Sequence, residues 1–195
     1  MLPPESVQKI RCRLPLPKRE ELDEEGKRAY DRLVDPRGGS LAGLHGPGGI
    51  RLHSPRVAAA QAALNQYLRF EAGLSGRVRE LAILITAREL DSAFEWTAHE
   101  AMALHEGVPQ ISVEAIRLRR NLDGVPEEDA VVIRFGRELF GCRKVSPETY
   151  AAALAMFEQR KLLDLVELMG FYASAAALLA AFDVHLDLEH APFQY

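Results

Sequence analysis

Three ionisable residues in the middle of the chain have the types and spacing of an acid–base site. Glu95 and His99 are four residues apart, so on a helix both side chains would project from the same face, within reach of each other. Glu80 precedes them in a separate apolar segment. A carboxylate can hold one ring nitrogen of a histidine and leave the other nitrogen to exchange a proton with a substrate. These three residues are therefore the candidate catalytic group.

The segment that must position them, residues 75–107, has the pattern of two helices joined by a tight turn at residues 90–92. Apolar residues recur at three- and four-residue spacing in both halves, and Gly107 is placed to end the second helix in a left-handed cap. Glu80 lies about ten residues before the turn and His99 about eight after it. With roughly 1.5 Å of rise per residue, an antiparallel hairpin would bring both side chains to nearly the same height.

Glu95 also has an ordinary structural explanation. Ser92 and Glu95 form a Ser-x-x-Glu pattern, which is typical of a capping box in which the glutamate bonds back to the start of its helix. The functional interpretation instead turns Glu95 inward, where the positive end of the helix dipole favours its ionised form. The sequence leaves both interpretations open.

Glu80 lies close to the buried stripe of its helix, and a carboxylate there needs a hydrogen-bond donor because burial without one is costly. We expect His99 to be that donor. Three nearby arginines are the alternative partners: Arg77, Arg79 and Arg88.

Three further residues are predicted to line a substrate pocket. Trp96, the only tryptophan, and Ser92 lie beside the catalytic group in sequence, and His53 follows a glycine-rich stretch. A tryptophan at such a position could equally belong to the core or to a subunit contact.

The composition excludes several classes of protein. The chain has 195 residues and a formal net charge of -4, and its basic residues are scattered, so no nucleic-acid or membrane surface is expected. Two cysteines far apart predict neither a disulfide framework nor a thiolate metal site, and they fit a cytoplasmic protein. His99-Glu100 begins an HExxH pattern, but residue 103 is alanine, and His185 and His190 are separated by five residues near the tail. We therefore expect no metal site.

The rest of the chain is predicted to be all-α, with about seven to eight helices. Residues 1–53 form an N-terminal extension with one helix at 20–34 and a glycine-rich loop at 38–49, whose role the sequence does not reveal. Residues 54–190 form the helical domain, with further helices at 54–70, 112–120, 126–140, 146–159 and 162–184. The apolar run between residues 167 and 183 is counted as too short to cross a bilayer. An internal repeat of 55–106 at 127–183 stays open because few residues match.

Three stretches in this order resemble one known family. RxRELAILxxA at 77–87, EWTAHEAMALHEGV at 95–108 and LVELMGFYASAAALLAAF at 165–182 are similar to the carboxymuconolactone decarboxylase and alkylhydroperoxidase D-like family, over residues 53–184. The resemblance implies an all-α alkylhydroperoxidase D-like fold built on an antiparallel helical hairpin. It also implies a homo-oligomer (dimer, trimer or hexamer) with active sites near subunit contacts.

The peroxidase branch of that family uses a C-x-x-C-x-x-x-H motif. In this chain the two cysteine positions fall on Ser92 and Glu95, and the histidine position falls on His99. Because neither thiol is present, the thiol peroxidase cycle is not available at this site. An antioxidant function by descent would need Cys142 as its thiol.

The decarboxylase branch works without the cysteines and without a cofactor, and it has a glutamate four residues before the histidine. The resemblance then implies that His99 transfers the proton, while Glu95 and Glu80 orient it. The leading hypothesis is a cofactor-independent, lyase-like enzyme that acts on a small carboxylate or lactone. A third hypothesis is a non-catalytic oligomeric small-molecule binder or scaffold, which predicts a solvent-facing Glu95 and no pocket around His99.

Overall fold

The computed structural model describes residues 11–35, 42–184 and 192–193 of the chain. Within these ranges the protein has eight α-helices and no strand, which confirms the predicted all-α fold. The other residues, including 38–41 of the glycine-rich loop and the tail histidines His185 and His190, lie outside the described part.

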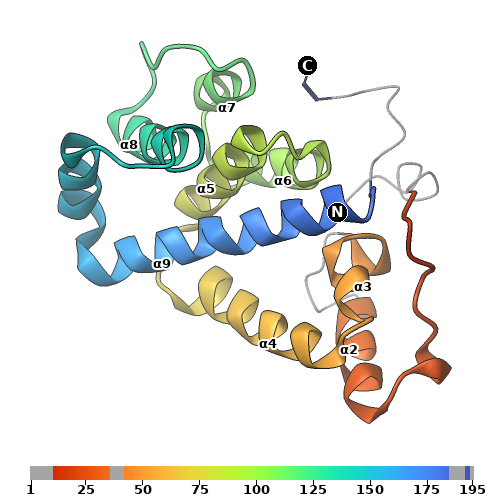
Figure 1. Cartoon of the computed structure of the whole chain (residues 1–195). Helices are drawn as coiled ribbons and strands as arrows, with labels where there is room; N and C mark the ends of the chain where they lie inside the picture. The colour runs from red at the N-terminus through yellow and green to blue at the C-terminus, as the bar shows by residue number, and fades with distance from the viewer. Residues whose placement is uncertain (1–10, 36–41, 185–191, 194–195) are drawn as a thin grey trace.

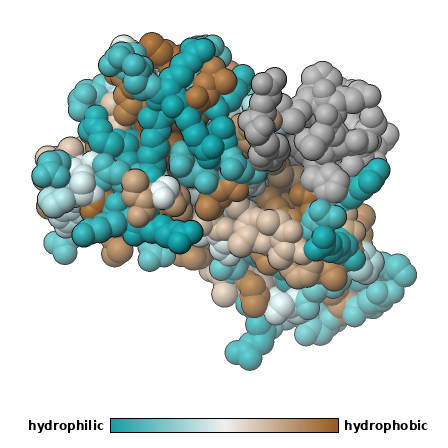
Figure 2. All heavy atoms as spheres, turned by 45° about the horizontal axis from the view of Figure 1, so that its top comes forward, coloured by the Kyte–Doolittle hydropathy of each residue, from teal (hydrophilic) through white to brown (hydrophobic). Residues whose placement is uncertain are grey.

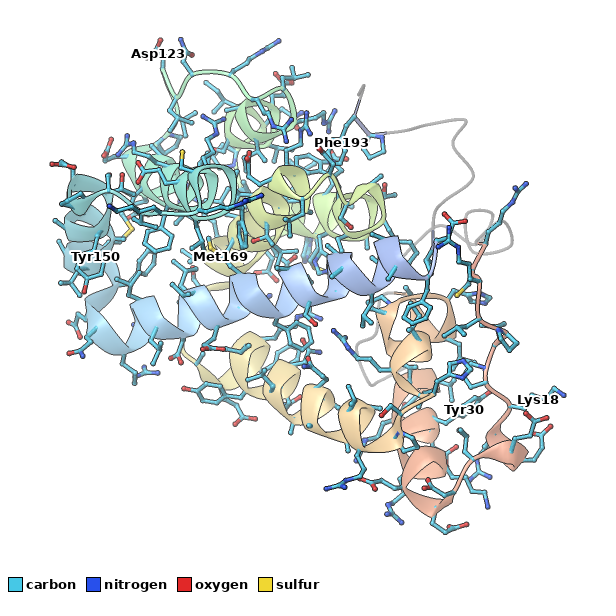
Figure 3. All side chains as sticks on the ribbon, viewed as in Figure 1. Lys18, Tyr30, Asp123, Tyr150, Met169 and Phe193 are labelled. Atoms are coloured by element: carbon cyan, nitrogen blue, oxygen red, sulfur yellow. The ribbon has the colours of Figure 1, made fainter. Side chains whose placement is uncertain are left out.

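One long helix, α9 (Pro147–Ala181), runs across the middle of the molecule between two groups of shorter helices (Figure 1). The group on one side comprises α5 (Gly76–Glu89), α6 (Ala93–His105), α7 (Gln110–Arg117) and α8 (Glu127–Gly136). The group on the other side comprises α2 (Glu24–Val34), α3 (Pro47–Arg51) and α4 (Pro55–Gln66). Met169 projects from α9 toward the α5–α8 side and is fully buried (Figure 3).

The predicted hairpin is present as α5 and α6, and its ends have the expected local causes. Ser75 accepts a hydrogen bond from the backbone N–H of Val78 at the start of α5. Asp91 turns the chain with φ of 49°, and Gly107 follows α6 with φ of 89°, the left-handed conformation that its position predicted.

Helix α5 is buried far more completely than a one-sided apolar stripe would be. Every residue from 80 to 88 is buried, because α6, α7, α8 and α9 all pack around this helix. At the α8 contact the approach is very close, since a Cβ built on Gly136 would lie 2.7 Å from Cγ1 of Ile85. Such close packing makes α5 a rigid support for the side chains that it carries.

Helix α9 joins the two helices that the sequence predicted at 146–159 and 162–184. It bends at Glu158, whose φ of 59° and ψ of 168° are not helical. By length and composition α9 is sufficient to cross a membrane, so the sequence estimate that its apolar run is too short was wrong. More than half of its most apolar window is buried within the protein, as in the core helix of a soluble protein. One such helix is therefore weak evidence for a membrane span.

The N-terminal helices form a smaller cluster against the start of α4. Ala29, Leu52 and Ala58 bury one another there. The turn before α3 is tight, because a Cβ on Gly49 would lie 1.8 Å from the carbonyl oxygen of Leu44. The predicted helix at 54–70 is α4 followed by one π-helical turn, η3 (Tyr67–Glu71). The division into an extension and a domain at residues 53 and 54 stays a prediction.

In the space-filling view, polar residues dominate the face over α7 and α8, and apolar residues appear there in smaller groups (Figure 2).

Candidate active site

Glu80 and His99 are in direct contact inside the protein. Oε2 of Glu80 lies 2.7 Å from Nδ1 of His99, and both side chains are almost fully buried. A glutamate that is ionised can only accept, so Nδ1 carries the proton and Nε2 is the nitrogen free to gain or lose one. The hairpin therefore brings the two residues to one height, as their spacing predicted.

Arginines complete the surroundings of Glu80. Nε of Arg79 donates to its Oε1 at 3.1 Å, and the guanidinium of Arg69 lies 3.7 Å from the same oxygen. Burial acts to raise the pKa of Glu80, but the hydrogen bond and charge of His99, together with the two arginines, lower that pKa below its usual value. Of the arginines considered from sequence, only Arg79 pairs with Glu80. Arg77 pairs with Asp129, and Arg88 pairs with Asp91.

Glu95 is turned inward and does not form a capping box. Ser92 makes no side-chain cap at the start of α6, and the Glu95 side chain is buried. Its Oε2 lies 3.7 Å from Nε2 of His99, which is beyond hydrogen-bond distance, and its Oε1 has no hydrogen-bond partner. Burial raises the pKa of Glu95, and the charges of His99 and Arg51 offset this only in part. The protonated form of Glu95 is therefore favoured relative to a glutamate in water.

A cavity of about 460 Å³ lies beside Glu95 and His99. Glu95, His99 and Tyr172 contribute to its wall from α6 and α9. The Tyr172 ring meets the His99 ring edge-on, with centroids 5.0 Å apart, and burial raises the pKa of the Tyr172 hydroxyl. The opposite wall is built from α2, the turn before α3, α3 itself and α4. The volume lies within the range of small-ligand sites.

Several polar atoms of residues that line the cavity are buried without a hydrogen-bond partner. They include Nη2 of Arg51, Oε1 of Gln61, Oδ1 of Asn65, Nε of Arg69 and Oε1 of Glu95. Buried polar groups in native proteins are normally hydrogen-bonded, and each exception needs an explanation. A bound ligand or water in the cavity would provide the missing partners.

The three residues predicted to form the pocket wall lie elsewhere. The Trp96 side chain is fully buried in the core, where its Nε1 donates to Glu100 at 3.0 Å and its ring meets Phe193. Ser92 is buried in the turn before α6 and does not line the cavity. His53 is exposed, lies 3.1 Å from the carbonyl oxygen of Pro15 and lines a separate cavity of about 190 Å³. Closeness in sequence was the basis for Trp96 and Ser92, and it does not fix which way a side chain points.

Neither cysteine lies at the larger cavity, and the described residues show no cluster of metal ligands. Cys12 and Cys142 are free and exposed, and neither lines that cavity. Within the described ranges no three histidine, cysteine, aspartate or glutamate side chains are grouped as metal ligands would be.

Sequence reasoning missed Arg51, Arg69 and Tyr172, all of which line the cavity. Tyr172 was noted only as part of the late helix in the family resemblance. Arg51 had a weak signal, since it is a single basic residue at the end of the glycine-rich stretch.

Comparison with known families supports the assignment of the hairpin. The family model described as "Carboxymuconolactone decarboxylase family" matches residues 55–133, which include Glu80, Glu95 and His99. Residues 55–133 are thus similar to that family. No curated protein matches the chain in sequence.

The carboxymuconolactone decarboxylase match begins at α4 and ends within α8. It contains the Glu80–His99 contact and Glu95. It does not contain α2, α3 or α9, which provide much of the cavity wall around them.

Proposed function

We propose that the protein is a cofactor-independent, lyase-like acid/base enzyme that acts on a small carboxylate or lactone. The observation that supports this most is the position of His99, held by Glu80 through Nδ1 and located at the wall of the cavity. An oriented imidazole at the edge of a ligand-sized cavity is the arrangement that general acid–base catalysis requires.

In the proposed reaction, the bond between the substrate carbon and its carboxylate breaks, and the electron pair stays on that carbon. Carbon dioxide leaves, and the imidazolium of His99 gives its Nε2 proton to the carbon. Glu80 remains ionised and stabilises the imidazolium before the transfer. The step needs no oxidant or reductant, and it balances when one proton is taken up from water for each carbon dioxide released.

Glu95 is the residue that restores the proton. Its carboxyl faces Nε2 of His99, and its raised pKa favours a protonated acid that can resupply the imidazole after each turnover. The glutamate would then recover its proton from water that enters with the next substrate.

A second candidate is a small-molecule binder without catalysis. The buried polar atoms without partners favour a ligand of some kind, but they do not by themselves require turnover. That hypothesis, in its scaffold form, predicted a solvent-facing Glu95 and no pocket at His99, whereas Glu95 is buried and His99 lines a cavity. We also propose that the protein is cytoplasmic and assembles as a homo-oligomer.

The experiment is a turnover assay with a panel of small unsaturated lactone acids, following carbon dioxide release. For a substrate that reacts, His99→Gln should lower kcat by about 10²- to 10⁴-fold, the usual contribution of a positioned acid–base group. Glu114→Gln, a substitution on α7 away from the cavity wall, is the matched control. Release of carbon dioxide by His99→Gln at the wild-type rate would remove the assignment.

A further inference from the structure

Arg51 is a buried cation whose hydrogen-bond donors are incompletely paired. It is the last residue of α3, it is 9% exposed, and its Nη2 has no hydrogen-bond partner. Its guanidinium lies 5.0 Å from the centre of the Phe171 ring. Among the described residues it forms no ion pair, whereas the neighbouring Arg69 is paired with Glu80. A buried guanidinium with an unpaired donor is expensive, so its retention needs a reason.

The cavity supplies a reason, because Arg51 lies in its wall together with apolar side chains. Leu52, Phe94 and Phe171 line the same space, along with several alanines of α4. A cavity of this kind fits a compact apolar body, and one buried cation at its edge fits one negative charge. A guanidinium binds a carboxylate through two parallel hydrogen bonds, a geometry that suits its planar fork of donors.

The wall that carries Arg51 is also close to the acid–base group. The charge of Arg51 acts on Glu95, and both residues line one cavity with His99. A ligand held at Arg51 would therefore extend toward Nε2 of His99.

We propose that Arg51 binds the carboxylate of a small organic acid whose body is apolar, so that a residue outside the family match determines the substrate class. The family match starts at residue 55, and Arg51 comes from the segment before it. This inference rests on the proposed function in one respect, namely that the cavity is the substrate site. It concerns binding and not catalysis.

The test is calorimetric titration with two acids and their neutral analogues. The probes are phenylacetate and cyclohexanecarboxylate, compared with phenylacetamide and cyclohexanecarboxamide. We expect the acids to bind the wild-type protein and the amides to bind more weakly. Arg51→Gln should weaken binding of the acids by roughly 10- to 100-fold, which is the loss expected from removing a charge-assisted hydrogen bond. Binding of the amides should be unaffected by the same substitution.

Two further variants separate the possible causes of a change in binding. Arg56→Gln is the matched control, because Arg56 is exposed and does not line the cavity. Arg51→Lys keeps the charge and should bind the acids with an affinity between those of the wild type and Arg51→Gln. Far-UV circular dichroism of each variant shows whether the fold is intact. The titration measures binding without turnover, so failure of the catalytic proposal would leave this result standing.

Two results would overturn the inference. One is an Arg51→Gln protein that binds the acids as tightly as the wild type does. The other is a wild-type protein that does not discriminate acids from amides, including one that binds none of the four probes.

Discussion

Glu80 of α5 and His99 of α6 are 19 residues apart in sequence, and their side-chain atoms Oε2 and Nδ1 meet at 2.7 Å inside the protein. The contact joins the two arms of the hairpin at the level of the cavity. It also places the Glu80 charge where three cationic or protonatable groups surround it: His99, Arg69 and Arg79.

Replacing Glu80 by glutamine should destabilise the fold by about 3 kcal/mol at pH 7, because its buried cationic partners lose their counter-charge. The pKa of Glu80 is lowered in the folded protein, so its contribution is present above the ordinary value of 4.5 and is lost as the pH falls. The difference between the two proteins should therefore stay constant from pH 7 down to about the ordinary value of 4.5 and narrow only below it. Urea unfolding at pH 7 and at a series of pH values below 4.5 measures this, with the exposed Glu128→Gln as control.

Glu95 should show the opposite dependence on pH. Burial raises the pKa of Glu95 in the folded protein. The stability that this carboxyl contributes is therefore fully present below its ordinary pKa of 4.5 and is lost as the pH rises through its folded-state pKa. Glu95→Gln removes that loss, so the variant should melt at a higher temperature than the wild type at pH 8 and at a similar one at pH 4. A lower melting temperature for Glu95→Gln at pH 8 would contradict the buried position of this carboxyl.

Two glycine substitutions should change the stability of the protein in opposite directions, because only one of these glycines is closely packed. Gly136→Ala would force a methyl group against Ile85 and should cost about 1–3 kcal/mol of stability, as overpacking of a core does. Gly170→Ala, in α9, meets no atom within 4 Å and should stabilise the protein by roughly 0.5–1 kcal/mol. Chemical denaturation of both variants and the wild type measures the change in the free energy of unfolding. A Gly136→Ala protein as stable as the wild type would show that α8 and α5 are less closely packed than described.

Substitution of Gly49 should weaken ligand binding without touching the acid–base residues. A methyl group at Gly49 cannot fit against the Leu44 carbonyl oxygen, so α3 must shift, and Arg51 must move with it. We expect Gly49→Ala to bind phenylacetate at least about tenfold more weakly than the wild type. Gly170→Ala is again the control, and unchanged affinity would argue against α3 as the carrier of the carboxylate-binding residue.

Removal of both thiols should leave lyase turnover unchanged. Cys12 and Cys142 lie outside the cavity wall, so the Cys12→Ser, Cys142→Ser double variant should retain the wild-type kcat on any substrate found in the lactone-acid panel. If that variant instead loses hydroperoxide reduction that the wild type performs, the antioxidant alternative gains support.

The hairpin and the Glu80–His99 contact were predictable because they depend on local rules. Helical periodicity, a tight turn and a fixed rise per residue decide the relative height of two side chains on adjacent arms. The inward position of Glu95 was open, since the capping box explained the same residues equally well.

The cavity wall was not predictable from the same rules. Arg51 reaches the site through packing of α2 and α3 on α4, which brings together segments that no local pattern relates. Trp96 shows the converse problem. It lies next to Glu95 in sequence, but adjacent residues of a helix face different directions, and Trp96 belongs to the core.

The family match begins at residue 55, and α2 and α3, which precede that residue, complete the cavity wall around His99. On the roles proposed for His99 and Arg51, proton transfer and carboxylate binding depend on consecutive stretches of one polypeptide. Changes in the earlier stretch would then alter which acid binds while the residues that transfer the proton stay intact, so proteins that share the hairpin would not need to share a substrate.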